Sequence, residues 1–77
     1  MIKLTKRLEE ICKLVAQGLG DSEIAEITGI TLATVKLHVW RARQVFGVKN
    51  RTALAIKYLD DRGAIDWKNF QKTICNL

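Results

Sequence analysis

The chain has 77 residues, enough for one small domain whose core buries only about 60 to 65% of the surface of the unfolded chain. Hydrophobic residues make up 48% of the sequence and proline is absent, which excludes a disordered chain or a loop-rich sandwich and indicates an all-α fold. Thirteen Lys and Arg against eight Asp and Glu give a formal net charge of +5, which favours an anionic partner.

Neither a signal peptide nor a membrane span is predicted, because no stretch approaches the roughly 18 apolar residues that a bilayer requires. Cys12 and Cys75 lie far apart and belong to no CxxC or Cys/His cluster, so neither a zinc site nor a disulfide framework is predicted. We therefore expect a reduced, cytoplasmic protein without a metal, a cofactor or a membrane partner.

The charges are unevenly distributed along the chain. Every acidic residue lies at or before Glu26 or at or after Asp60, so all the charged residues in between are basic: Lys36, Arg41, Arg43, Lys49, Arg51 and Lys57. This segment is more typical of an anion-binding surface than of a merely solvated basic one.

Two helices are predicted in the first third of the chain. Thr5 is a favourable N-cap for the first, which ends at Gly18 and Gly20. A second, short helix runs from about residue 21 to 28, with Gly20 or Asp21 as its N-cap, and must be held by packing because a helix of this length is not stable alone. The apolar positions of the first helix recur at helical spacing: Leu8, Ile11, Cys12, Val15 and Leu19.

The longest predicted helix covers residues 31–46. Gly29 supplies the left-handed end of the preceding helix and Thr31 is the N-cap of this one. A helix, a short turn containing Gly and a second helix form the arrangement of a helix-turn-helix motif.

This third helix has two faces that require different neighbours. The inward stripe consists of Val35, Val39, Ala42 and Phe46, with Leu32 at its edge. The opposite face carries Ala33, Lys36, Leu37, Trp40, Arg41 and Gln44. Because a solvated face is normally filled with charged and polar groups, the exposed Leu and Trp indicate a contact other than water.

A fourth helix is predicted over residues 51–61, with Asn50 as its N-cap. One apolar side consists of Leu54, Ala55, Tyr58 and Leu59, whereas Thr52, Ala53 and Ile56 lie elsewhere on the helix and are candidates for contact with a partner subunit. The alternative is that Ile56 is a scattered surface residue.

Residues 1–63 form the predicted domain, and residues 64–77 form a tail or a short fifth helix. In this tail Trp67, Phe70 and Ile74 have helical spacing, so the two aromatic residues are candidates for docking or dimer contact.

The outer face of the third helix has the residue types that read DNA bases in the major groove, where Lys and Arg recognise guanine, Gln recognises adenine and apolar groups contact the thymine methyl. The base-reading candidates are Lys36, Leu37, Trp40, Arg41 and Gln44. Arg43, Lys49 and Arg51 are candidates for phosphate contacts. His38, at the edge of the buried stripe, is expected to orient the helix or bond a phosphate; no Ser, Cys or acidic partner that would support catalysis is placed beside it.

The segments EIAEITGI, TVKLH and FGVKNR occur together at the spacing of one known family. They resemble the LuxR/GerE-type helix-turn-helix domain, whose pattern begins LTxRE and continues through GxSxxEIA, GIsxxTVKxH and LGVxsR; the resemblance covers roughly residues 4 to 62. It implies a four-helix domain whose third helix enters the major groove and whose fourth helix forms a dimer interface. Carried over by position, it implies base reading by Lys36, Leu37 and Trp40, and backbone contacts by Thr34, Lys49 and Arg51.

Three departures from the family pattern matter. Arg7-Leu8 replaces the usual Arg-Glu pair, which affects the expected buried polar pairing of the first helix but not its packing. Trp40 stands where Lys or another polar residue is common, so the family's base preference does not transfer. Family members usually carry an upstream receiver or ligand-binding domain, whereas this chain resembles a freestanding GerE-like effector domain. We therefore expect neither phosphorylation nor autoinducer control.

Two hypotheses for the function follow. The first is a sequence-specific regulator of transcription that binds double-stranded DNA as a homodimer and is not an enzyme. The second is a protein-interaction module that pairs with and antagonises a larger regulator of the same family. RNA polymerase is a further candidate partner, and similarity to the promoter-reading fourth region of sigma factors is disfavoured by the GVKNR connection.

Overall fold

The computed structural model describes residues 2–64, and within that range it contains four helices and no strand. The helices are α1 (Lys6–Ala16), α2 (Asp21–Thr28), α3 (Leu32–Phe46) and α4 (Arg51–Asp61). The prediction of an all-α, four-helix domain is confirmed. The predicted fifth helix, with Trp67 and Phe70, lies outside the described residues.

The side-chain caps predicted from the sequence determine where the helices begin. The hydroxyl oxygens of Thr5 and Thr31 accept hydrogen bonds from the amides of Leu8 and Thr34, each at 3.2 Å. The Asn50 side chain accepts from the Ala53 amide at 2.7 Å and starts α4 in the same way. Each cap satisfies an amide that the first turn leaves without an intrahelical partner.

At the start of α2 the two alternatives are resolved in favour of Gly20, whose amide donates to the Glu23 side chain at 3.1 Å. Gly18 ends α1 as predicted, but Leu19, predicted on the apolar face of the helix, lies beyond its end. The helix stops at Ala16, and Gly18 takes a positive φ of 86°, so Leu19 packs on the core from the turn rather than from the helix.

Glycines in the left-handed conformation end both α2 and α3. Gly29 has φ 75° and Gly47 has φ 67°, values that side chains with a Cβ rarely adopt. α3 therefore begins after the Thr31 cap, as the sequence predicts, and ends at Gly47.

The hydrophobic core receives side chains from all four helices. The predicted stripe of α3 is buried in full, and Phe46 meets the Tyr58 ring edge-on at a centroid separation of 6.3 Å. Leu32, predicted at the edge of that stripe, is instead 42% exposed, so the buried stripe begins at Val35. The fully buried large side chains are Ile11, Ile24, Leu54, Val35 and Cys12.

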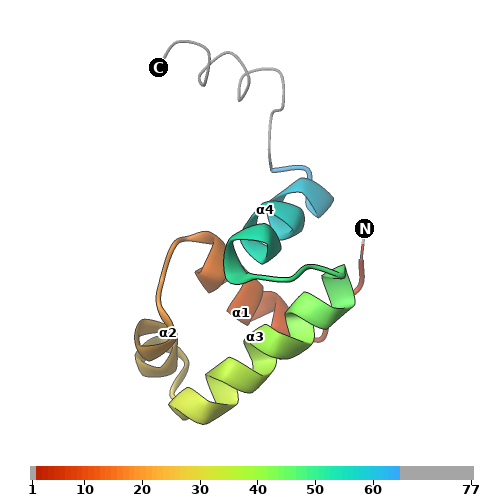
Figure 1. Cartoon of the computed structure of the whole chain (residues 1–77). Coiled ribbons are helices and arrows are strands. Elements are labelled where there is room, and N and C mark those ends of the chain that lie inside the picture. Colours follow the sequence, from red (N-terminus) through yellow and green to blue (C-terminus); the bar gives the residue numbers. More distant parts are fainter. Residues whose placement is uncertain (1, 65–77) are drawn as a thin grey trace.

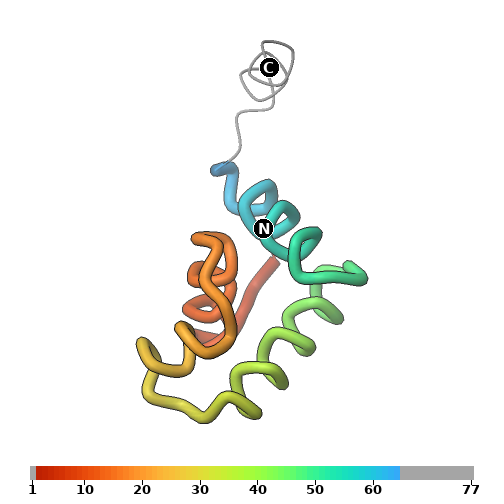
Figure 2. The backbone as a smooth tube through the Cα atoms, turned by 60° about the vertical axis from the view of Figure 1, so that its left-hand side comes forward, coloured from red at the N-terminus to blue at the C-terminus, as the bar shows by residue number. Residues whose placement is uncertain are grey.

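α3 forms one long side of the molecule in both views, with α2 near its first residues and α4 near its last (Figures 1 and 2). α1 packs against all three other helices. The short helix α2 is thus held by its neighbours, and α3 is supported along its inner stripe while its opposite face is left uncovered.

A polar cluster, which we call the α1–α4 clasp, joins the start of the chain to the end of α4. It consists of Glu9, Tyr58, Asp61 and Arg62 with the backbone of Ile2. The guanidinium of Arg62 bonds the Glu9 carboxylate at 2.6 and 3.2 Å, and the Tyr58 hydroxyl donates to the same carboxylate.

The clasp also grips the backbone of residue 2. The Ile2 amide donates to the Asp61 carboxylate at 3.0 Å, and the Ile2 carbonyl accepts from Arg62 at 2.9 Å. These bonds close a loop between residues 59 positions apart in the sequence.

Candidate nucleic-acid interface

The outer face of α3 is exposed as the sequence predicts. Leu37 is 45% exposed and Trp40 is 53% exposed, although both are large apolar side chains. The three polar candidates for base reading, Lys36, Arg41 and Gln44, are also exposed. The structure therefore brings the five base-reading candidates together on one uncovered side of a helix whose other side is buried.

Thr34 and His38 lie at the flank of α3, and both are half-buried. The hydroxyls of Thr31 and Thr34 bond each other at 2.8 Å, so the Thr34 side chain helps to cap its own helix. The Nδ1 atom of His38 is buried and has no hydrogen-bond partner within residues 2–64. A phosphate contact by His38 would consequently need its other ring nitrogen.

The connection between α3 and α4 is tied to α3 by an arginine. One terminal nitrogen of Arg43 donates to the carbonyl oxygen of Lys49, while the Lys49 side chain is exposed. Arg43 is predicted to reach a phosphate, but one of its five N–H donors bonds its own chain.

Arg51 also bonds its own chain. Its Nη1 atom donates to the Asp21 carboxylate at 2.5 Å, and its Nη2 atom donates to the Leu19 carbonyl at 2.5 Å. Arg51 therefore links the first residue of α4 to the start of α2 across 30 positions of sequence, a tie that sequence reasoning missed. No local signal marks it, because the sequence assigns Asp21 a satisfactory role at the N-terminal end of the α2 dipole.

Asp21 and Arg51 lie in a surface groove between α2, α3 and the start of α4. We call it the α2–α4 groove; it is lined by Asp21, Lys36, Val39, Trp40, Arg43 and Arg51. Three cations and one carboxylate share this groove, and two of its residues, Lys36 and Trp40, are also base-reading candidates. The groove is thus continuous with the outer face of α3.

The candidates for a partner contact on α4 are less buried than the core side of that helix. Ile56 is 47% exposed, Thr52 is exposed and Ala53 is half-buried, whereas Leu54 and Tyr58 are buried. Trp67 and Phe70, the other two candidates, lie outside the described residues.

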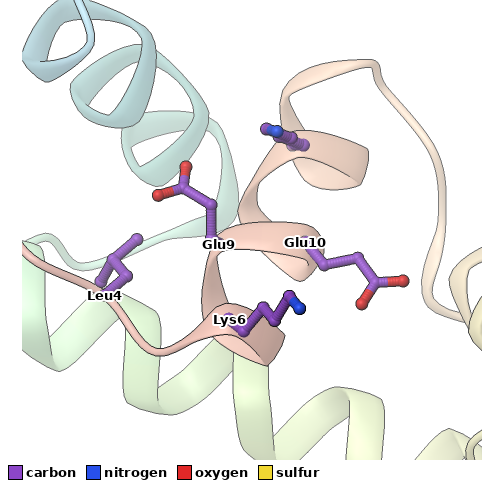
Figure 3. Close-up of a pocket in the computed structure, with 5 residues that line it drawn as sticks. Leu4, Lys6, Glu9 and Glu10 are labelled. Atoms are coloured by element: carbon purple, nitrogen blue, oxygen red, sulfur yellow. The ribbon is translucent and has the colours of Figure 1, made fainter.

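A second hollow lies on the outer side of α1 and is lined by Leu4, Lys6, Glu9, Glu10 and Lys13 (Figure 3). Its two carboxylates point in different directions: Glu9 toward α4, and Glu10 away from it. Because Glu9 is engaged by Arg62 and Tyr58, this hollow lacks convergent polar groups that would hold a ligand.

Within residues 2–64 no group of three or more His, Cys, Asp or Glu residues is arranged to hold a metal ion. No helix in that range is long and apolar enough to cross a membrane. Burial raises the pKa of the Cys12 thiol to about 11, which leaves this cysteine a packing residue with little thiolate.

A short helix, a turn through a left-handed glycine and a long helix with an uncovered basic and apolar face define the helix-turn-helix class of domain. Residues 3–58 match the family described as bacterial regulatory proteins, luxR family, and the chain belongs to that family. The resemblance inferred from the motifs is confirmed. The family is one of DNA-binding regulators rather than of catalysts, which agrees with the prediction that the chain is not an enzyme.

Similar proteins include bacterial response regulators. The chain is 36% identical over 61 residues to the nitrate/nitrite response regulator protein NarP of Escherichia coli, covering 79% of this chain and 28% of NarP. It is 41% identical over 54 residues to the nitrate/nitrite response regulator protein NarL of the same species, covering 70% of this chain and 25% of NarL. The response regulator protein VraR of Staphylococcus aureus is 42% identical over 53 residues, with 69% and 25% covered. The chain thus spans about a quarter of the length of these relatives.

Proposed function

We propose that this domain regulates transcription by binding double-stranded DNA in a sequence-specific manner, with α3 in the major groove. The observation that carries the proposal is the outer face of α3, where Leu37 and Trp40 are about half exposed beside Lys36, Arg41 and Gln44. These residue types match the donors, acceptors and methyl groups of base edges. A bacterial regulator that binds chromosomal DNA acts in the cytoplasm, which is therefore the proposed location.

Selection of bound duplexes from a random-sequence pool tests sequence specificity. We expect enrichment of one sequence. Affinity for it should fall at least about tenfold between 50 and 200 mM salt, because the release of counterions from the DNA gains less entropy as the salt concentration rises. The proposal fails if no sequence is enriched and binding to duplex is absent at the lower salt concentration.

Trp40 is the residue of this face at which the sequence preference is expected to differ most from that of relatives. We expect Trp40→Lys to fold normally and to select a different sequence, because it exchanges a large ring with one N–H donor for a flexible cation with three. Selection with both proteins in parallel measures this; an unchanged consensus would remove Trp40 from the base-reading set.

We further propose that two copies bind together through α4. The exposed Ile56, next to Thr52 and Ala53, supports this, because a two-fold contact uses the same patch of both copies and so covers this apolar side chain twice. Two copies predict half-sites about ten base pairs apart. Sedimentation of Ile56→Gln, with the exposed neighbour Lys57→Gln as control, should show dissociation for the first variant alone.

A second candidate function is a protein-interaction module that pairs with a larger regulator of the same family and antagonises it. Ile56 favours it as well, and so does the use of Arg43 and Arg51 donors within the chain, which leaves fewer donors for phosphates. This function predicts that the domain releases a purified full-length regulator from its operator without binding that operator itself. A further proposed partner is RNA polymerase. Direct binding of the domain to the purified polymerase tests this.

A further inference from the structure

The α2–α4 groove combines three basic residues with one acidic residue. Lys36 and Arg43 come from α3 and Arg51 from α4, whereas Asp21 is the first residue of α2. Asp21 is the only carboxylate that lines this groove among the described residues. Its charge opposes the approach of a phosphate group to a surface that is otherwise positive.

The guanidinium of Arg51 is directed at Asp21 and not at solvent alone. The 2.5 Å bond to the carboxylate and the 2.5 Å bond to the Leu19 carbonyl use two of its five N–H donors. Three donors remain, and 35% of the Arg51 side chain is exposed. Arg51 is therefore held in place with part of its donor set free, but its positive charge is already matched by a carboxylate.

We propose that Asp21 is an affinity-setting residue of the DNA interface: by neutralising Arg51 in the α2–α4 groove, it weakens the contact of this groove with one phosphate group of the duplex. This inference rests on the proposed DNA-binding function. When this phosphate contact is weakened, affinity depends more on the base contacts of α3 and less on contacts with the DNA backbone.

Asp21→Asn separates the charge of residue 21 from its hydrogen bond. The amide oxygen of Asn still accepts from Arg51, so the arginine keeps its position, while the negative charge is removed. One additional neutralised phosphate steepens the slope of log K against log salt by about 0.9, which corresponds to binding about 5- to 15-fold tighter at 50 mM salt.

The matched control is Glu26→Gln. Glu26 lies on the same helix, is exposed and does not line the groove, and its substitution raises the net charge by the same amount. Fluorescence anisotropy with a random-sequence duplex of about two helical turns, from 50 to 200 mM salt, measures affinity and salt slope for the wild type and both variants. We expect less than a twofold change for Glu26→Gln.

A second arm tests whether Asp21 acts through Arg51. In the presence of Arg51→Gln, Asp21→Asn should raise affinity only by removing the repulsion between Asp21 and phosphate, and it should leave the slope of log K against log salt unchanged, because no arginine is present to neutralise an additional phosphate group. A salt slope that steepens by about 0.9 in that background as well would overturn the role of Arg51.

The measurements separate a failure of the role of Asp21 from a failure of DNA binding. If the wild type binds duplex and Asp21→Asn binds no more tightly than Glu26→Gln, the role of Asp21 is wrong while the DNA-binding function stands. If none of the proteins binds duplex at 50 mM salt although all melt cooperatively, the proposed function fails and the role of Asp21 fails with it.

Discussion

Two polar regions of this small domain use charged side chains in opposite ways. In the α1–α4 clasp, Arg62 is 14% exposed in its side chain and bonds Glu9, Asp61 and the backbone of residue 2. On the outer face of α3, Lys36 and Arg41 are exposed beside Trp40, which is 53% exposed. Charge that is satisfied inside the chain stabilises the fold, whereas charge mixed with exposed apolar surface is available to a partner.

The α2–α4 groove lies between these two extremes. Arg51 bonds Asp21 and the Leu19 carbonyl, as a clasp residue would, but it does so in a groove shared with Lys36 and Trp40 of the outer face. One arginine thus serves both packing and the candidate interface, so substitutions there are expected to alter stability and binding together. Substitutions in the other two regions are expected to separate these effects.

The largest effect on DNA binding without an effect on stability is expected for Lys36→Ala. Loss of a base or phosphate contact should cost about 1 to 3 kcal/mol of binding free energy for the selected duplex, while the free energy of unfolding should change by less than about 0.5 kcal/mol. Isothermal titration and urea unfolding measure the two quantities. Lys57→Ala, an exposed lysine of α4, is the control, and equal losses in both variants would mean that only net charge matters.

The opposite result, a loss of stability without a loss of DNA affinity, is expected for Tyr58→Phe in the clasp. The hydroxyl donates to the Glu9 carboxylate, and the ring is buried against Phe46 and beneath Arg62. Removing that hydrogen bond should lower the free energy of unfolding by about 1 kcal/mol. Affinity for the selected duplex should stay within twofold of the wild type; a large loss of affinity would show that the clasp and the interface are coupled.

Acid should weaken the clasp only as the pH falls below the range in which exposed glutamates are protonated. The hydrogen bond from Arg62, followed by that from Tyr58, lowers the pKa of Glu9, so folding favours the ionised form. The resulting stability is fully present above the ordinary Glu pKa of about 4.3 and is lost as the pH falls through the lower pKa of the folded state.

Urea midpoints measured from pH 7 to 3 test this. We expect Glu9→Gln to be less stable than the wild type at pH 7 and to lose less stability on acidification. Glu10→Gln is the matched control and should parallel the wild type, because the Glu10 side chain is 50% exposed in its ion pair with Arg7. Parallel curves for all three proteins would contradict the assignment to Glu9.

The smallest effect is expected for Arg7→Ala. Arg7 pairs with Glu10 at 3.3 Å, three residues apart on α1, and its side chain is 42% exposed. Exposed pairs of this kind contribute about 0.3 to 0.5 kcal/mol, so thermal unfolding should shift little and duplex affinity should not change. A loss comparable to that of Tyr58→Phe would extend the clasp to the exposed side of α1.

The fold was predictable because its determinants are local. Thr31, Asn50 and Gly47 act within one helical turn of their own positions, and the period of Val35, Val39 and their successors defines the buried side of α3. Exposed Trp40 and Leu37 followed from the same period.

The polar ties between distant elements were not predictable. Arg62 and Glu9 are 53 positions apart and Arg51 and Asp21 are 30 positions apart, so no periodicity relates them. The sequence interpretation of Arg51 as a free phosphate ligand therefore missed its bond to Asp21. Likewise, the departure at Arg7-Leu8 obscured that the polar pairing of α1 is made by Glu9, the next residue along.

The length of the uncovered face of α3 limits how much DNA one copy can inspect. From Lys36 to Gln44 it extends about 12 Å along the helix axis, at about 1.5 Å per residue. That length matches about four base pairs at about 3.4 Å each. A four-base-pair word recurs by chance about once in every 256 base pairs, far too often among the million or more competing sites of a genome to mark a single promoter. Recognition of a single promoter therefore requires a second DNA contact, and the proposed two-fold pair of domains would supply it by doubling the length of the recognised sequence.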